Sequence, residues 1–129
     1  RYIAIEEVGR KGVRVVARKM LPKLTTRKDF APELLDMMLK TPKKGMVAAL
    51  KAMAERPDAL EWLGEISAPS VVIGGLNDEL IPIEHSQTMA QMLTRGWLVE
   101  VPQASHLPMM EAPQAVADAL IQLVNMAAA

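Results

Sequence analysis

The sequence predicts an α/β fold in which a helical region is followed by a two-strand parallel β-α-β-α unit. Two observations predict it. Residues 1–65 carry apolar residues at helical spacing between proline and glycine breaks. In residues 66–129, two short apolar runs alternate with two helical patterns, and this order favours parallel strands joined by a right-handed crossover. We therefore divide the chain into these two regions.

The first region is expected to form several helices. From Ile5 to Pro22, apolar residues recur at roughly helical spacing, although Gly9 and Gly12 each weaken the helix by up to ~1 kcal/mol. Asp29 is a suitable N-cap for the next helix, because a short acidic side chain can accept a hydrogen bond from the first turn. The further helices are expected over residues 29–40, 42–55 and 57–64.

The second region changes to a strand-helix-strand-helix order. The β-branched run at 70–73 is typical of a strand buried on both faces of a parallel sheet, and 97–101 is the second expected strand. A helix over 84–93 joins them, and a last helix starts at Pro113. These two helices are expected to bury their apolar residues Met89, Met92, Leu93, Val116, Leu120, Leu123 and Val124.

The charge of the chain is unevenly distributed although its net value is zero. Residues 1–56 carry 14 Lys and Arg against 6 Asp and Glu, a balance of +8, whereas residues 57–129 carry 1 against 9, a balance of −8. This split indicates either a basic helical region on an acidic remainder or attraction between the halves of two subunits. We expect no nucleic-acid partner, because the basic half offers only Tyr2 and Phe30 for base stacking.

The composition favours a cytoplasmic protein with no membrane partner. The sequence contains no cysteine, which fits a reducing compartment, and no apolar run approaches the ~20 residues of a membrane helix. The first residues do not form a signal peptide, because acids follow a short apolar stretch at once. Because the chain does not begin with methionine, we expect that it starts inside a longer protein or was trimmed.

An acid and a histidine follow the two expected strands. Asp78 ends the segment 74–78, Gly-Gly-Leu-Asn-Asp, and His106 lies within 104–108, Ala-Ser-His-Leu-Pro. The carboxyl ends of parallel strands meet at one edge of a sheet, so we expect these side chains to lie close together, as the acid and the histidine of a Ser-His-Asp triad do. The nucleophile motif Gly-x-Ser-x-Gly is absent from the sequence, since no glycines flank the serines Ser67, Ser70, Ser86 and Ser105.

The chain resembles the α/β-hydrolases in three segments. Residues 66–82 are similar to the seventh strand and acid loop of that family, and residues 103–113 are similar to its histidine loop and final helix. Residues 46–58 resemble the end of the helical cap in the lactonase and carboxylesterase branch. The resemblance implies that this is the C-terminal half of such a fold, a cap followed by the last two strands, with Asp78 as the catalytic acid and His106 as the catalytic base.

The resemblance also implies a hydrolase that acts on esters, lactones or related activated substrates. The family's other half holds six strands, the nucleophile elbow and the oxyanion hole, so the chain is expected to be a truncated form. Glu111 would pin the histidine loop. Met109 and Met110, beside His106, are candidates for the apolar wall of a pocket for a small-molecule substrate, because thioethers adapt to irregular shapes.

A metal-dependent hydrolase is the first alternative. Imidazole and carboxylate groups of His85, His106 and Asp78 are ligand types that suit Zn²⁺ or Mn²⁺. A bound metal would replace the absent serine, because it lowers the pKa of its water and generates a nucleophile that attacks phosphoesters as well as carboxylic esters. The sequence has no recognised metal-binding spacing, so the site is expected to be completed by Glu79, Glu84 and Glu111 or by a second copy of the chain.

The expected partner is a second copy of the chain. Two parallel strands cannot cover both faces and both edges of a sheet, so the edge of the strand at 70–73 and the helices of residues 1–65 are expected to form a homodimer or to exchange between subunits. In a second arrangement, another chain supplies the half of the fold that carries the serine. A third alternative is a non-catalytic remnant that binds a hydrophobic ligand or partner.

Overall fold

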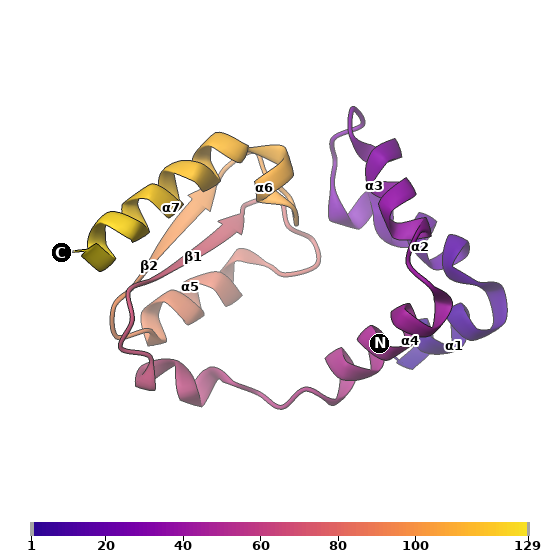
Figure 1. The fold of residues 1–129 in the computed structure, drawn as a ribbon, viewed down its shortest axis with the longest axis horizontal. Helices are drawn as coiled ribbons and strands as arrows, with labels where there is room; N and C mark the ends of the chain where they lie inside the picture. Colours follow the sequence, from indigo (N-terminus) through magenta and orange to yellow (C-terminus); the bar gives the residue numbers. More distant parts are fainter. Residues whose placement is uncertain (1, 129) are drawn as a thin grey trace. The chain divides into compact units, whose positions relative to one another are not determined.

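The described part of the chain, residues 2–128 of the computed structural model, forms two compact units. The first unit contains Arg1–Pro22 and Thr26–Pro57, and the second contains Lys23–Thr25 and Asp58–Ala129. The short segment Lys23–Thr25 therefore lies in the second unit, although the residues on both sides of it belong to the first. Figure 1 shows the elements of both units in sequence colours.

The first unit is helical, as the spacing of its apolar residues predicts. Its helices are α1 (Tyr2–Lys11), α2 (Val13–Leu24, of which the last two residues lie in the second unit), α3 (Ala31–Leu39) and α4 (Lys43–Glu55). The helix expected from Ile5 to Pro22 is in fact two helices, because Gly12 adopts a φ of 81° that a helix does not accommodate. Pro22 lies inside α2 and does not end it.

A small apolar core holds the first unit together. Val8 of α1, Val16 of α2 and Leu50 of α4 are buried, and α1 packs against α4. Residues packed around this core are Ala4, Ile5, Val13, Met20, Met46 and Val47. Met53, near the end of α4, is 40% exposed and is not part of this core.

The start of α3 differs from the expected one. The N-cap position is Phe30, and it makes no side-chain hydrogen bond to the helix. Asp29 does not cap the helix, since its carboxylate pairs with the guanidinium of Arg27. A proline in the first turn favours the helix start instead, because its fixed φ suits that position and its missing N–H would have no helical partner.

The second unit contains the parallel strand pair. Its elements are a 3₁₀ helix η1 (Leu60–Glu65), β1 (Ser70–Gly75), α5 (Ile83–Met92), β2 (Gly96–Val101), α6 (Pro108–Glu111) and α7 (Pro113–Ala128). Strands β1 and β2 pair in parallel from Ser70 opposite Gly96 to Gly75 opposite Val101. The predicted α/β fold is therefore confirmed, with one helical turn, α6, that the sequence pattern did not indicate. In Figure 1, α5 lies along one side of the strand pair and α7 along the other.

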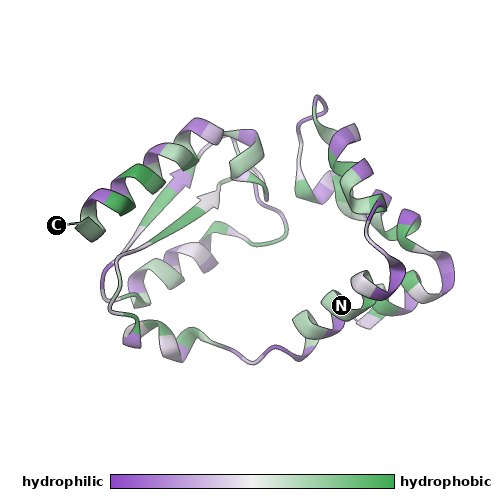
Figure 2. Cartoon of the chain, in the orientation of Figure 1, coloured by the Kyte–Doolittle hydropathy of each residue, from purple (hydrophilic) through white to green (hydrophobic). Residues whose placement is uncertain are grey.

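Several apolar side chains of α5 and α7 are exposed, contrary to expectation. Met89 and Met92 are 39% and 38% exposed, and Leu120 and Val124 are 49% and 64% exposed. The cause is the narrow sheet, because two strands cover only one strip of a helix that packs on them. Of α7, only Ala119 is buried, and Figure 2 shows apolar residues recurring along the helix.

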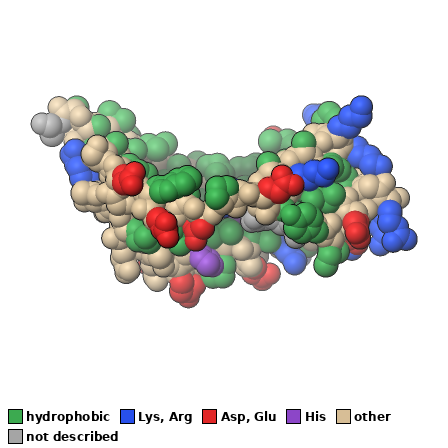
Figure 3. Space-filling view, turned by 90° about the horizontal axis from the view of Figure 1, so that it is seen from below, with side chains coloured by type: hydrophobic (Ala, Val, Ile, Leu, Met, Phe, Trp, Pro, Cys, Tyr) green, Lys and Arg blue, Asp and Glu red, His purple; other side chains and the backbone are tan. Residues whose placement is uncertain are grey.

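The edge of β1 away from β2 has no strand partner among residues 2–128, which agrees with the expected exposed edge but does not test dimerisation. Charge follows the division into units, and Figure 3 shows blue Lys and Arg side chains gathered on the first of them. No helix in the described part of the chain is long and apolar enough to cross a bilayer.

Candidate active site

The loop after β1 presents Asp78 with its carboxylate already oriented. One oxygen, Oδ1, accepts hydrogen bonds from the backbone N–H groups of Leu80 at 2.8 Å and Ile81 at 2.9 Å. The Asp78 amide donates to the carbonyl of Gly75 at 3.3 Å, so the loop turns immediately after the strand. These local bonds leave the second oxygen, Oδ2, directed at another partner. That partner is His106.

The imidazole of His106 lies against this carboxylate. Nδ1 of His106 and Oδ2 of Asp78 are 2.9 Å apart, as the two expected triad residues require. An ionised carboxylate only accepts hydrogen bonds, so Nδ1 carries the proton in this pair and Nε2 of the neutral ring is the acceptor. The Asp78 side chain is 10% exposed and the His106 side chain 33%, so the outer part of the ring can meet a reactant.

The environment keeps Asp78 ionised. Burial alone raises the pKa of its carboxyl group, because a charge loses water contacts. The hydrogen bonds from Ile81, His106 and Leu80 outweigh burial, and together they hold the pKa of Asp78 below its ordinary value of 3.8. The group is therefore an anion at neutral pH, which is the state that orients and stabilises a histidine base.

A second buried carboxylate holds the loop on which His106 lies. Glu111, only 7% exposed, accepts hydrogen bonds through Oε2 from the amides of Ser105 at 2.6 Å and Leu107 at 3.3 Å. Its other oxygen, Oε1, accepts from the hydroxyl of Thr25 at 2.6 Å. The amide of His106 donates to the carbonyl of Leu24 at 3.2 Å. Glu111 thus contacts the histidine loop, as the sequence resemblance implies.

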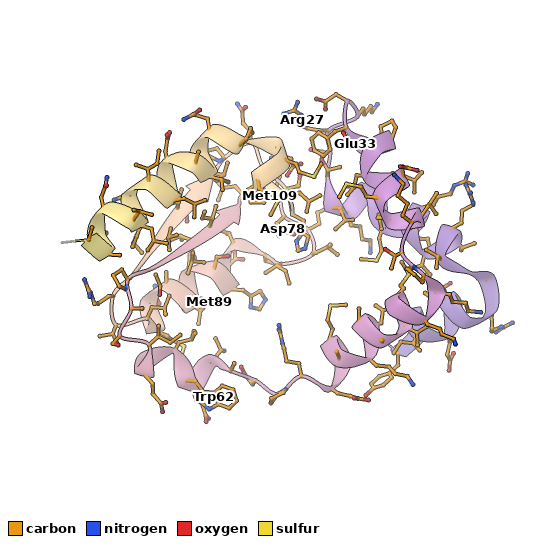
Figure 4. All side chains as sticks on the ribbon, viewed as in Figure 1. Arg27, Glu33, Trp62, Asp78, Met89 and Met109 are labelled. Carbon is orange, nitrogen blue, oxygen red and sulfur yellow. The ribbon has the colours of Figure 1, made fainter. Side chains whose placement is uncertain are left out.

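A shallow cleft of about 220 Å³ lies beside the Asp78–His106 pair. Its lining residues are Ile73, Gly74, Gly75, Asp78, Ile81, Ser86, Ser105, His106, Pro108 and Met109. Met109 is 55% exposed at this cleft, and Figure 4 shows it near Asp78. Met110, the other expected pocket residue, is not part of the lining. The cleft therefore has apolar walls beside the Asp78–His106 pair.

The end of β1 has two glycines in close contact with their neighbours, and Gly75 lies where this strand meets the His106 loop. A Cβ atom at Gly75 would lie 2.1 Å from the carbonyl oxygen of Ser105 and 2.4 Å from that of Ala104. At Gly74, a Cβ atom would lie 2.9 Å from Oγ of Ser86 and 2.6 Å from Cδ1 of Ile83. The end of β1 can approach the histidine loop this closely because Gly75 lacks a side chain.

The expected metal site does not form within the described residues of one chain. No group of three His, Cys, Asp or Glu side chains is placed to hold a metal ion there. His106 is paired through Nδ1 with Asp78, whereas His85 lies on the exposed first turn of α5, where its amide donates to the carbonyl of Pro82. The structure therefore brings together Asp78 and His106, but not the expected set of His85, His106 and Asp78.

The contact between the histidine loop and residues 24–25 was not foreseen from the sequence. Thr25 and Glu111 are 86 residues apart, and a threonine after a helix carries no local pattern that indicates such a partner. Among the serines, Ser86 lines the cleft, while Ser105 is buried and its backbone amide is bound to Glu111. Neither lies on a glycine-flanked turn between a strand and a helix.

Comparison with solved structures gives the same architecture. An esterase from Thermogutta terrifontis superposes with a TM-score of 0.88 at 32% identity, covering 96% of this chain and 48% of the esterase. The enol-lactonase from Burkholderia xenovorans LB400 has a TM-score of 0.88 at 20% identity, covering 96% of this chain and 49% of the lactonase. The chain thus spans about half the length of these solved structures.

Comparison with curated sequences also finds an esterase, and the match covers less than half of that relative's length. A pimeloyl-[acyl-carrier protein] methyl ester esterase from Xanthomonas oryzae pv. oryzae is 25% identical over 124 residues, which cover 96% of this chain and 44% of the esterase. Other curated relatives match over as little as 12% of their length. No protein-family model matches the sequence.

Proposed function

The chain has the fold of the C-terminal half of an α/β-hydrolase, a cap followed by the last two strands, and we propose that it supplies the acid and the base of an ester hydrolase. The observation that carries this proposal is the 2.9 Å contact between Nδ1 of His106 and Oδ2 of Asp78 beside a cleft. The nucleophile is a serine outside residues 1–129, in the same protein or in a partner chain.

In this mechanism, Nε2 of His106 takes the proton of the serine hydroxyl as the oxygen attacks the ester carbonyl carbon. Asp78 remains an anion and stabilises the imidazolium that forms. The same proton then passes from Nε2 to the leaving alkoxide, and the acyl group stays on the serine. In the second half-reaction, Nε2 takes a proton from water as the water oxygen attacks the acyl carbon. The bond from that carbon to the serine oxygen then breaks, Nε2 returns the proton to the serine oxygen, and the acid is released.

The cleft favours substrates with an apolar part near the ester. Met109 and Ile81 are 55% and 42% exposed, and both line the cleft with Ile73. A small apolar acyl or alkoxy group would cover these side chains on binding. The similarity to esterases and to a lactonase agrees with carboxylic esters or lactones as the substrate class.

For the arrangement in which no serine-bearing half of the fold pairs with β1, we also propose that a second copy of the chain covers the open edge of this strand. An unpaired strand edge offers N–H and C=O groups to another strand, and exposed apolar residues of α7 lie in the same unit. Light scattering at micromolar concentration would then give twice the mass of one chain. A monodisperse, folded monomer would contradict this arrangement.

The catalytic proposal is tested by hydrolysis of a nitrophenyl ester by the complete natural protein that contains these residues. We expect His106→Gln and Asp78→Asn to lower kcat/KM by about 10³-fold or more, because triad members act as a unit. His85→Gln is the matched control, since His85 lies on an exposed helical turn, and it should retain activity. Full activity in His106→Gln would overturn the proposal. Loss of activity in His85→Gln together with inhibition by a chelator would favour a metal-dependent enzyme.

A further inference from the structure

We propose that Thr25 is a positioning residue for His106, and that it acts through the buried carboxylate of Glu111. This inference rests on the proposed role of His106 as the base. The segment Lys23–Thr25 is a strap, by which we mean the short stretch that lies in the second unit between two stretches of the first. Its contacts to the histidine loop are the basis of the proposal.

Glu111 gathers donors from both sides of His106. Oε2 accepts from the amides of Ser105 and Leu107, the residues directly before and after the histidine. Two bonds to one oxygen fix the backbone on which the imidazole is mounted. A shift of this carboxylate therefore moves the imidazole relative to Asp78, whose own position is set by Leu80 and Ile81.

Thr25 holds the other oxygen of the same carboxylate. The Thr25 side chain is 5% exposed and Glu111 is 7% exposed, and the hydroxyl lies 2.6 Å from Oε1. A buried carboxylate is costly unless donors surround it, and a short bond from a hydroxyl to a charged oxygen is among the stronger ones. Valine in place of Thr25 has nearly the same shape but leaves Oε1 without this donor.

The strap makes a second, independent contact with the loop. The amide of His106 donates to the carbonyl of Leu24, the last residue of α2. Three consecutive backbone amides are therefore held. Those of Ser105 and Leu107 donate to Glu111, and that of His106 donates to the strap. The chain enters the first unit again at Thr26, so the strap is continuous along the chain with stretches of the first unit on both of its sides.

The test compares Thr25→Val and Thr25→Ser in the full chain by NMR. Serine keeps the hydroxyl, and Thr88→Val is a matched control, because the Thr88 hydroxyl donates to the carbonyl of Glu84 within its own helix. The readouts are the low-field resonance of the His106 Nδ1 proton and the exchange rates of the Ser105 and Leu107 amides. Neither readout depends on catalytic activity.

In Thr25→Val we expect the two amides to exchange roughly tenfold faster or more, because the Glu111 carboxylate that holds them loses a donor. We also expect the Nδ1 resonance to broaden or disappear. A tenfold change in exchange corresponds to about 1.4 kcal/mol. Thr25→Ser and Thr88→Val should resemble the wild type. If Thr25→Val leaves the resonance and both exchange rates unchanged, the proposal is wrong. If it speeds exchange throughout the chain, as global unfolding does, the proposal is also wrong, because Thr25 would then have a structural role alone.

The kinetic arm uses the complete natural protein and separates this inference from the function on which it rests. We expect Thr25→Val to lower kcat for a nitrophenyl ester about tenfold with little change in KM, since the cleft lining does not include Thr25. Thr25→Ser should restore kcat. If NMR shows the expected changes while His106→Gln leaves hydrolysis intact, the strap holds the loop but the proposed function fails.

Discussion

The two units place their charged contacts in different surroundings. In the first unit, the ion pairs Lys11–Glu7, Lys19–Glu7, Arg27–Asp29 and Lys40–Asp36 all lie at the surface. In the second unit, the carboxylates of Asp78 and Glu111 are largely buried. N–H groups donate to Asp78, and both N–H groups and a hydroxyl donate to Glu111. The first unit is held by an apolar core, and the second concentrates buried polar contacts around one histidine.

This difference indicates that substitutions at the buried carboxylates should cost more stability than substitutions at the exposed ion pairs. Exposed ion pairs contribute little to stability, typically about 0–1 kcal/mol, because water screens them. A buried carboxylate that loses a donor keeps its full desolvation cost, so each of its partners matters. Substitutions of equal size should therefore have unequal effects in the two units, and the following predictions test that contrast from the largest effect to the smallest.

The largest effect is expected for Gly75→Ala at the end of β1. The added Cβ atom would lie 2.1 Å from the carbonyl oxygen of Ser105, and backbone must move to relieve the contact. We expect the free energy of unfolding to fall by about 3 kcal/mol or more, because neither strand nor loop can yield cheaply. Urea unfolding monitored by circular dichroism measures this change. A stability within 0.5 kcal/mol of the wild type would contradict it.

A smaller loss is expected for Val8→Ala in the core of the first unit. Val8 is fully buried against Val16 and Leu50, so the substitution removes buried methyl groups and leaves a cavity. We expect the free energy of unfolding to fall by about 2 kcal/mol. The His106 Nδ1 resonance should be unchanged, because the hydrogen bonds described above for Asp78 and His106 do not involve α1. Loss of the His106 Nδ1 resonance in this variant would contradict the prediction that a change in the core of the first unit leaves the Asp78–His106 contact intact.

A pH-dependent effect is expected for Asp78→Asn. The folded pKa of Asp78 lies below 3.8, its ordinary value, so the ionised group adds stability that is fully present above pH 3.8. That contribution is lost as the pH falls from 3.8 through the folded pKa. We expect the variant to be less stable by about 1.5–2 kcal/mol at pH 7, the lower part of the range for hydrogen bonds to a charged group. Unfolding at pH 7 and at pH 3 should show this difference shrinking, and an equal difference at both values would contradict the account.

The smallest effect, and one of opposite sign, is expected for Gly9→Ala in α1. Nothing lies within 4 Å of a Cβ atom at this position, and the residue is inside a helix. Alanine loses less conformational freedom than glycine on folding, so the free energy of unfolding should rise by about 0.5–1 kcal/mol. Thermal unfolding of this variant beside Gly75→Ala compares one substitution in both units. A destabilised Gly9→Ala would show that the open space at α1 is needed for another contact.

The sequence was informative wherever short-range patterns determine structure. The strand order and the pairing of Asp78 with His106 could be predicted, because parallel strands bring their carboxyl ends to one edge. The break at Gly12 was underestimated, because a glycine within an apolar pattern can either continue a helix or end it.

Long-range contacts and burial could not be predicted in the same way. The bond between Thr25 and Glu111 depends on the approach of segments that are distant along the chain, and no local pattern encodes it. The burial expected for Leu120 and Val124 assumed a sheet wide enough to cover α7, whereas two strands cover only part of it. His85, His106 and Asp78 do not form a metal-binding group within the described residues of one chain, because positions that share one sheet edge need not bring all their side chains together.

The central claim is that His106, oriented by Asp78, activates a serine supplied from outside residues 1–129. The most direct measurement is the rate at which a fluorophosphonate labels the complete natural protein, compared with its His106→Gln and His85→Gln variants. We predict covalent labelling of one serine in the wild type and in His85→Gln, and labelling slowed by about 10³-fold or more in His106→Gln. Equal labelling rates in the wild type and His106→Gln would contradict the account.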